Sequence, residues 1–357
     1  NILSITIPEN ITYIGESAFE ACIKLSELYY KAKKVEDLEE SNCTFYQTGK
    51  LSINGLNVKF GKNVERIPAY LFYPYHSTSN NDIEYSPQIK EIIFDDESKC
   101  KSIGKFAFRT NEIAEIEIPD GIESIEEYAF AECENLKKVV IPETVKFIDK
   151  HAFTECKNIK TAGPENGGYD FEFGWKKSIP SYAFSCCGNW FDTKSYIEKV
   201  TLPNSIEQIG DYAFECTQIS TLTLPNGVMS IGKRAFKDCK NLKELTIPKS
   251  VSNMGGEVFI NCPLLVSAGS IDTESTLKFG WTEKIPDSAF DNASYLNEIK
   301  LPNSIKEIGN SAFKNCSAIT SIILPNKLEI IGNESFYNCN QIKEINLPST
   351  LVSIGAD

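Results

Sequence analysis

An apolar pattern recurs along the chain about every 23 residues. One half of the repeated unit is seen at 242–248, where Leu242, Leu245 and Ile247 precede Pro248. Apolar and polar residues alternate up to the proline, which has no N–H group to donate to a sheet ladder. This half of the unit predicts a short strand that stops at its Ile-Pro or Leu-Pro pair.

The second half of the unit is seen at 304–316, where apolar residues lead through an Ile-Gly pair to Ala-Phe and then to a cysteine. Their offsets favour a tight turn followed by about one turn of helix. The slot that holds Gly309 holds Pro180 in another copy, and proline excludes a positive φ. We therefore place this slot at the entrance to a short helix, where proline suits the first turn and glycine suits close packing.

The phenylalanines of the Ala-Phe pairs mark the copies. From Phe108 to Phe336 they follow one another at intervals of 22, 23, 31, 30, 22, 23, 31, 23 and 23 residues. A unit of this size cannot bury its own apolar residues, whereas stacked copies bury one another. The pattern predicts an α/β repeat fold, a solenoid with a short strand and a short helical turn per coil. We expect it to form a single domain over residues 1–357.

Two kinds of irregularity interrupt the period. Long coils fall at about 157–184 and 263–290, and each contains a Phe-Gly-Trp segment, 106 residues apart. We expect each long coil to bulge from one edge of the solenoid. Irregular coils and an inserted loop occupy about 29–101, a stretch that includes a dense set of aromatic residues.

Charge and composition exclude several classes of function. The chain has 36 Lys and Arg against 49 Asp and Glu, a formal net charge of −13. An acidic chain is poorly suited to binding nucleic acid or an anionic bilayer through charge. The sequence contains no apolar run of about eighteen residues, so it does not predict membrane insertion. The two histidines, His76 and His151, accompany no nucleophile motif, and we interpret both as surface residues.

Most of the twelve cysteines follow the repeat phenylalanine by three residues. This position predicts buried thiols that stack as a ladder and pack as small apolar groups. Cys43, Cys100 and Cys186 lie off the ladder, and pairing and free thiols both stay open for them. The spacing does not match a zinc cluster, so we predict no metal and no cofactor. Five Asn-x-Ser/Thr triplets are explained by turn chemistry.

The 23-residue period, I-x-L-P, S-I-G-x-x-A-F and the trailing cysteine resemble the BspA-like leucine-rich repeats found in surface proteins of bacteria and some protozoa. The resemblance covers nearly the whole chain apart from about 31–58 and 73–88. It implies a secreted or cell-surface protein that binds host proteins or other cells, without shared catalytic residues. It assigns no binding residue, because the shared positions are core positions.

Two surfaces supply candidate contact residues. One is formed by the residues that flank the middle apolar position of each strand and point away from the core, and the other is the aromatic block near 70–85. For the sheet face, a plain solvated surface is the alternative. Trp175 and Trp281 recur at the same position, which favours packing, whereas Trp190 does not recur. The candidate protein-contact residues are Tyr70, Tyr73, Tyr75, Tyr85, Glu115, Glu117, Lys138, Lys199, Glu244, Glu298, Lys300 and Glu344.

These observations favour a non-enzymatic module for protein binding or adhesion, secreted or displayed at a cell surface. The expected partners are proteins, with extracellular-matrix and host cell-surface proteins as the candidates. A structural spacer that displays other domains is the alternative, and an enzyme acting on carbohydrate is disfavoured because no acid–base pair emerges. Both ends cut through a repeat and no signal peptide is visible. We therefore expect a fragment of a longer extracellular or surface protein, separated from its export signal.

Overall fold

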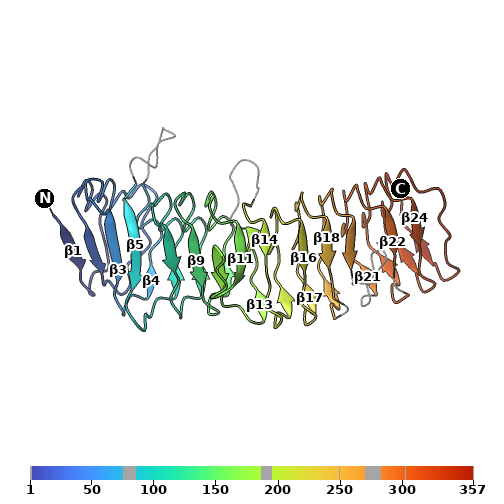
Figure 1. Cartoon of the computed structure of the whole chain (residues 1–357), viewed down its shortest axis with the longest axis horizontal. Helices are drawn as coiled ribbons and strands as arrows, with labels where there is room; N and C mark the ends of the chain where they lie inside the picture. The colour runs from blue at the N-terminus through green and yellow to red at the C-terminus, as the bar shows by residue number, and fades with distance from the viewer. Residues whose placement is uncertain are drawn as a thin grey trace. The chain divides into compact units, whose positions relative to one another are not determined.

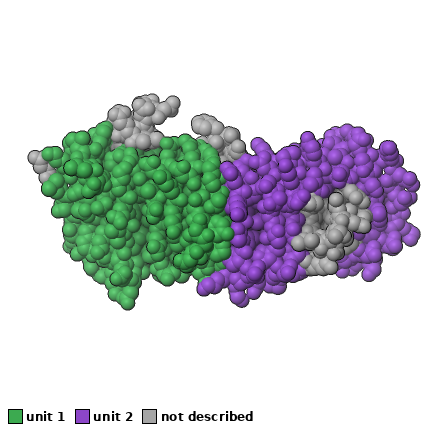
Figure 2. All heavy atoms as spheres, in the orientation of Figure 1, with its two compact units in different colours: residues 1–175, 186–196 green, residues 176–185, 197–357 purple. Residues whose placement is uncertain are grey.

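The computed structural model describes residues 2–74, 86–185, 195–248, 250–269, 283–301 and 303–356. The chain forms two compact units, shown in different colours in Figure 2: residues 1–175 with 186–196 are unit 1, and residues 176–185 with 197–357 are unit 2. Each unit consists of short parallel strands joined by turns. Among the described residues there is no helix with the length and hydropathy that a membrane span needs.

Unit 1 contains longer strands, several of them labelled in Figure 1, and a second row of two-residue strands. The longer strands form one sheet in the order β1-β2-β3-β5 and another in which β7, β9, β12 and β11 are neighbours, while the two-residue strands follow the order β4-β6-β8-β10. The longer strands are β1 (Ser4–Ile7), β2 (Glu27–Tyr30), β3 (Leu56–Phe60), β5 (Ile89–Phe94), β7 (Glu115–Glu117), β9 (Lys138–Ile141), β11 (Thr161–Pro164) and β12 (Phe171–Phe173). The two-residue strands are β4 (Arg66–Ile67), β6 (Ser102–Ile103), β8 (Ser124–Ile125) and β10 (Phe147–Ile148).

Unit 2 repeats the same two rows of strands. Its sheets follow the orders β16-β18-β20, β22-β24, β13-β15-β17-β19 and β21-β23-β25-β26. The first row contains β14 (Lys199–Val200), β16 (Thr221–Thr223), β18 (Glu244–Thr246), β20 (Ser267–Gly269), β22 (Glu298–Lys300) and β24 (Ser321–Ile323). The second row contains β13 (Ser178–Ile179), β15 (Gln208–Ile209), β17 (Ser230–Ile231), β19 (Asn253–Met254), β21 (Lys284–Ile285), β23 (Glu307–Ile308), β25 (Ile330–Ile331) and β26 (Ser353–Ile354).

The repeat phenylalanines stack inside each unit. In unit 2 the ring centroids of Phe214 and Phe236 are 4.9 Å apart, and those of Phe236 and Phe259 are 5.5 Å apart. In unit 1 the rings of Phe108 and Phe130 stack at 5.2 Å. All five side chains are fully buried. The expectation that successive coils shelter one another's phenylalanines is confirmed within each unit.

The predicted helical turn is wrong, because the segment around each phenylalanine hydrogen-bonds to the next coil. Tyr212 and Cys216 have φ values of 56° and 62°, in the left-handed region. The N–H groups of Tyr212, Phe214 and Cys216 donate to carbonyls of the following coil, and that of Phe214 reaches Ala235 at 2.8 Å. An α-helix needs negative φ throughout and bonds from each N–H to the carbonyl four residues earlier. No part of the described chain forms an α-helix in this segment.

The glycine slot therefore follows a two-residue strand and does not begin a helix. Gly210 comes directly after β15 and lies against the backbone of the preceding coil. A Cβ atom built on it would be 2.5 Å from the Ser181 nitrogen. Close packing, and not a positive φ, is what favours glycine there, as the proline in the equivalent slot of other coils indicates.

The first long coil differs from the predicted bulge. Its extra residues form β11, which pairs in parallel with β12 of the same coil, and β12 pairs with β9. Both strands join the sheet face. Trp175 follows β12, is 2% exposed and donates its indole N–H to the Val145 carbonyl at 2.9 Å, so its predicted packing role is confirmed. Trp190 and Trp281 lie outside the described residues.

The cysteine ladder is confirmed in the described part of the chain, where Cys133, Cys239, Cys262 and Cys316 are buried free thiols. Cys239 Sγ donates to the Phe214 carbonyl at 3.0 Å, and Cys262 Sγ donates to the Phe236 carbonyl at 3.0 Å. Burial raises the pKa of the Cys133 thiol to about 12. Cys100 is also buried and free, whereas Cys186 lies outside the described residues.

Candidate functional site: a groove on the sheet face of unit 1

The outward residues of β7 and β9 follow directly from strand alternation. Ile116 and Val139 are buried, whereas Glu115 and Glu117 on either side of Ile116 are exposed and Lys138 is half-buried. Successive side chains of a strand point to opposite faces, so the core requirement of the middle residue presents its neighbours to solvent. Three predicted contact residues thus share one face of the sheet.

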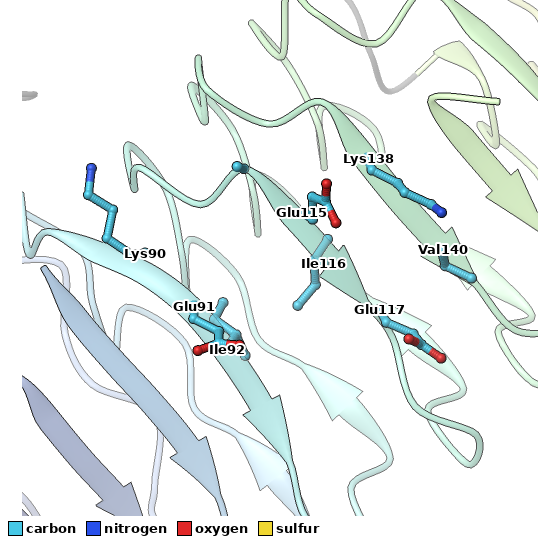
Figure 3. A pocket seen from close by; sticks show the side chains of 9 residues that line it. Lys90, Glu91, Ile92, Glu115, Ile116, Glu117, Lys138 and Val140 are labelled. Atoms are coloured by element: carbon cyan, nitrogen blue, oxygen red, sulfur yellow. The ribbon is translucent and has the colours of Figure 1, made fainter. Parts of the chain in front are cut away.

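These residues border a groove between β5 and β7, which Figure 3 shows with its side chains. One part has a volume of about 380 Å³ and is lined by residues of β5, β7 and β9, including Ile92, Glu115 and Lys138. An adjoining part has a volume of about 550 Å³ and extends past the strand ends to Asp96 and Asp120. Ile92 and Glu117 line both parts, so the two parts adjoin, and together they are called the groove below.

The groove coincides with a break in the sheet. β5 is the last strand of the sheet that begins at β1, and β7 is the edge strand of the next, so that these two fully described strands share no ladder. The Asp95 N–H donates to Phe60 on β3, and the Ile118 N–H donates to Val140 on β9. Backbone groups alternate in direction along a strand. Those of Phe94 therefore face the groove from one side and those of Glu117 from the other.

A bulge in β5 lies beside this break. Leu56 pairs with Ile89 and Asn57 pairs with Glu91, so Lys90 is an extra residue in β5 relative to β3. Bulges bend a strand and increase its twist, which disrupts the ladder locally. The bulge gives a physical reason for the sheet to part at this position.

Part of the acidic rim is used by the fold itself. The Tyr29 hydroxyl donates to Asp95 Oδ2 at 2.6 Å, and Lys59 Nζ lies 2.8 Å from Asp95 Oδ1. The hydrogen bond from Lys59, followed by that from Tyr29, lowers the pKa of the Asp95 carboxyl. Asp95 occupies the position that holds proline in regular coils, and it ties the ends of three neighbouring strands together.

Five other carboxylates of the groove are exposed and make no ion pair within 4.0 Å and no side-chain hydrogen bond in the described part of the chain. The two lysines of the groove are already engaged. Lys90 Nζ binds the Glu112 carboxylate, and Lys138 Nζ lies 3.9 Å from Glu172 Oε1. The groove is therefore acidic. The five carboxylates belong to Glu91, Asp96, Glu115, Glu117 and Asp120.

The predicted aromatic contact residues lie elsewhere and are largely engaged in packing. Tyr73 is 9% exposed, its hydroxyl accepts a hydrogen bond from Arg109 Nη1 at 2.8 Å, and its ring lies 5.2 Å from that of Phe106. Tyr70 is half-buried and stacks on Phe106 at 5.2 Å. This packing does not favour Tyr73 as a contact residue. Tyr75 and Tyr85 lie outside the described residues.

The remaining candidates do not gather at the groove. Lys199, Glu244 and Glu344 are exposed residues of unit 2, and Glu344 lies outside the strands. Glu298 and Lys300 belong to β22, whose side chains are outside the described set. The structure thus brings together Glu115, Glu117 and Lys138, and it adds Glu91, Asp96 and Asp120, which were not among the predicted contact residues. In the sequence, these added residues share one feature: each is a polar residue that lies next to, or shortly after, the apolar residues of a strand.

One group of side chains has the composition of a metal site. Glu215, Cys216 and Asp238 place ligand atoms within 4.8 Å of one another. Lys237 Nζ lies 2.7 Å from Glu215 Oε1 and 3.0 Å from Asp238 Oδ2, so an ammonium group already supplies the positive charge there. The arrangement is an ion-pair cluster between coils.

His151 is half-buried in the structure, which corrects its interpretation as a surface residue. Its ring stacks on Tyr128 at 5.1 Å, and its Nδ1 lies 3.2 Å from Thr154 Oγ1. Burial, followed by the charge of Lys150, lowers the pKa of His151. This environment is that of a packed ring in a turn. His76 lies outside the described residues.

Parallel strands in two rows, turns without helices and a stacked phenylalanine core define a repeat scaffold of the leucine-rich-repeat class. The chain belongs to the family described as the BspA type leucine rich repeat region, whose model matches residues 1–96, 79–189, 176–278 and 273–357. No curated protein matches the chain. The family and the structural neighbours below are described as leucine-rich repeat proteins.

Three of the similar solved structures are of bacterial proteins. A leucine-rich repeat protein from Bacteroides ovatus is 27% identical, with a TM-score of 0.66 over 99% of this chain and 83% of that one. A leucine-rich repeat protein from Eubacterium ventriosum is 17% identical, with a TM-score of 0.59 over 99% and 88%. A leucine rich cell surface protein from Faecalibacterium prausnitzii is 20% identical, with a TM-score of 0.37 over 100% and 88%.

Proposed function

We propose that the chain is a non-enzymatic protein-binding module, secreted or displayed at a cell surface, that contacts a protein partner through the sheet face of unit 1. The groove between β5 and β7 is the observation that carries this proposal. It gathers Glu115, Glu117 and Lys138 around one depression. A repeat scaffold presents such a face rigidly, because each coil is held by its neighbours.

Membership of the BspA-type family supports the surface location and the adhesive role. The alternation of buried and exposed strand residues also supports the display of a binding surface. Core residues occupy alternate strand positions, so the exposed positions can vary without disturbing the stacked phenylalanines. Extracellular-matrix and cell-surface proteins are the partner class that we expect.

A binding array tests the proposal. The full chain, labelled at its N-terminus, is applied to immobilised extracellular-matrix and cell-surface proteins, and each hit is measured again by surface plasmon resonance. We expect at least one saturable partner. Glu117→Ala should weaken that interaction, whereas Glu329→Ala, which changes an exposed residue directly before β25 of unit 2, should not. Failure to find any partner would favour the structural spacer instead.

A further inference from the structure

We propose that the groove binds an extended, lysine- or arginine-rich segment of its protein partner. This inference rests on the proposed function and adds the chemistry and conformation of the bound segment. It combines three observations in unit 1, namely an elongated depression along the strands, a floor with apolar and backbone groups, and a rim of carboxylates that lack cationic partners.

The shape of the groove favours an extended chain. It runs along β5, which has six residues, and continues past the strand ends at Asp96 and Asp120. At about 3.3 Å per residue, six extended residues span roughly 20 Å. A helix is about 10 Å wide with its side chains, which is more than the closest Cα separation of β5 and β7, within 8 Å, so an extended segment fits along these strands better.

The floor offers both apolar contact and hydrogen-bonding groups. Ile93 is 41% exposed on β5, and Val140 is half-exposed on β9. Between them lie the backbone groups of Phe94 and Glu117 that face the break in the sheet. Unpaired backbone groups at a sheet edge are sites at which a second chain can bond.

The segment lies over the break and does not complete the sheet. Inserting a strand would need a spacing of about 9–10 Å between β5 and β7, twice the distance between neighbouring strands. Cα atoms of β5 and β7 approach one another within 8 Å. The bound segment therefore contacts the groove mainly through side chains that point into it.

The charge of the rim selects a basic segment. In much of this chain carboxylates of one coil pair with lysines of the next, as Glu134 does with Lys157 at 2.6 Å. The five groove carboxylates depart from this arrangement and make no such pair among the described residues, although Lys90 and Lys138 are close. Opposite charge on a partner steers the encounter and sets the register more than it adds affinity.

The experiment uses the full chain and two fluorescein-labelled twelve-residue peptides, one alternating Lys and Val and one alternating Glu and Val. Fluorescence anisotropy measures binding at low salt. We expect the lysine peptide to bind and the glutamate peptide not to bind. Each exposed ion pair contributes a factor of about 1.5 to 5, so Glu115→Gln with Glu117→Gln should weaken binding about fivefold. Raising the salt to 0.3 M should weaken it further.

Glu329→Gln is the matched control, since it neutralises an exposed glutamate directly before β25 of unit 2. It should leave peptide binding unchanged, and circular dichroism of both variants should match that of the original chain. Equal binding of the two peptides, or equal loss in the control, would overturn the inference. If calcium ions alone slow amide exchange in the groove and the lysine peptide does not bind, the inference is overturned as well.

The array separates this inference from the proposed function. If the chain binds an array partner that Glu115→Gln with Glu117→Gln leaves unaffected, the basic segment is wrong while the binding module stands. If neither array proteins nor peptides bind, both are wrong.

Discussion

Replacing Phe236 with alanine tests the stacked core directly. The Phe236 side chain is fully buried between the rings of Phe214 at 4.9 Å and Phe259 at 5.5 Å. An aromatic side chain buries about 150–250 Å², which at about 25 cal/mol per Å² corresponds to roughly 4–6 kcal/mol. Alanine keeps a small part of this, and measured Phe→Ala changes in cores cost about 3–5 kcal/mol. We expect a loss in that range.

Urea unfolding followed by circular dichroism measures the loss, as a lower midpoint with an unchanged slope. Because coils contact mainly their neighbours, amide exchange should rise most in the coils on either side of Phe236. Phe236→Leu is the control, since it keeps most of the apolar volume, and it should cost only about 1–2 kcal/mol. A loss below about 1 kcal/mol for the alanine variant would refute the reasoning.

Three further outcomes are expected. Gly255→Ala should lower the unfolding midpoint, because the new Cβ would lie 2.4 Å from the backbone of the preceding coil. Gly256→Ala should be tolerated, because its Cβ would be 3.5 Å from the nearest atom, the Asp287 carbonyl oxygen, and thermal melts compare the two variants. In native protein at pH 8 iodoacetamide should modify the half-exposed Cys22 and spare Cys133, whose pKa burial raises to about 12, and mass spectrometry reads the sites. The pKa of Asp95 is lowered by its lysine and tyrosine partners, so its stabilising contribution is present above about pH 4 and is lost as the pH falls through its folded value. Asp95→Asn should therefore lower the melting temperature at pH 7 and have a smaller effect at pH 2.

The repeat period predicted the strands and the core because both depend on residues close in the chain. Alternation placed Ile116 inside and Glu115 and Glu117 outside, and the structure confirms this. The recurrent phenylalanines predicted stacking, since an aromatic side chain repeated once per coil meets its own equivalent in the next coil. In each of these cases the local pattern and the contacts between coils favour the same arrangement.

The helix was predicted wrongly for a reason that lies outside any single coil. Apolar residues at helix-compatible offsets also suit two left-handed turns, and the choice depends on where the N–H groups find acceptors. The carbonyls of the next coil, such as Ala235 for Phe214, satisfy them without a helix. A single repeat does not contain these acceptors, so its pattern alone could not distinguish the two outcomes.

The groove was even less predictable, because it arises from a mismatch between neighbouring coils. Leu56 and Val58 are separated by one residue, whereas Ile89 and Ile92 are separated by two, and this difference produces the bulge at Lys90. The spacing can be read from the sequence. Its consequence is a break in the sheet between β5 and β7, lined by carboxylates that make no ion pair among the described residues. That consequence depends on how these two strands are placed next to one another in the folded chain.

A regular repeat leaves few places where a partner can find a distinctive surface. Equivalent coils present equivalent edges, and ion pairs between coils, such as Lys157 with Glu134, neutralise one another. A bulge breaks both regularities at once, because it opens the ladder and moves charged side chains out of register with their counterparts. If recognition in this chain depends on such a break, restoring the regular spacing in β3 by inserting one residue between Leu56 and Val58 should weaken partner binding even though every groove carboxylate remains in place. Loss of binding without loss of the carboxylates would identify the parted sheet itself, and not charge alone, as the recognised feature.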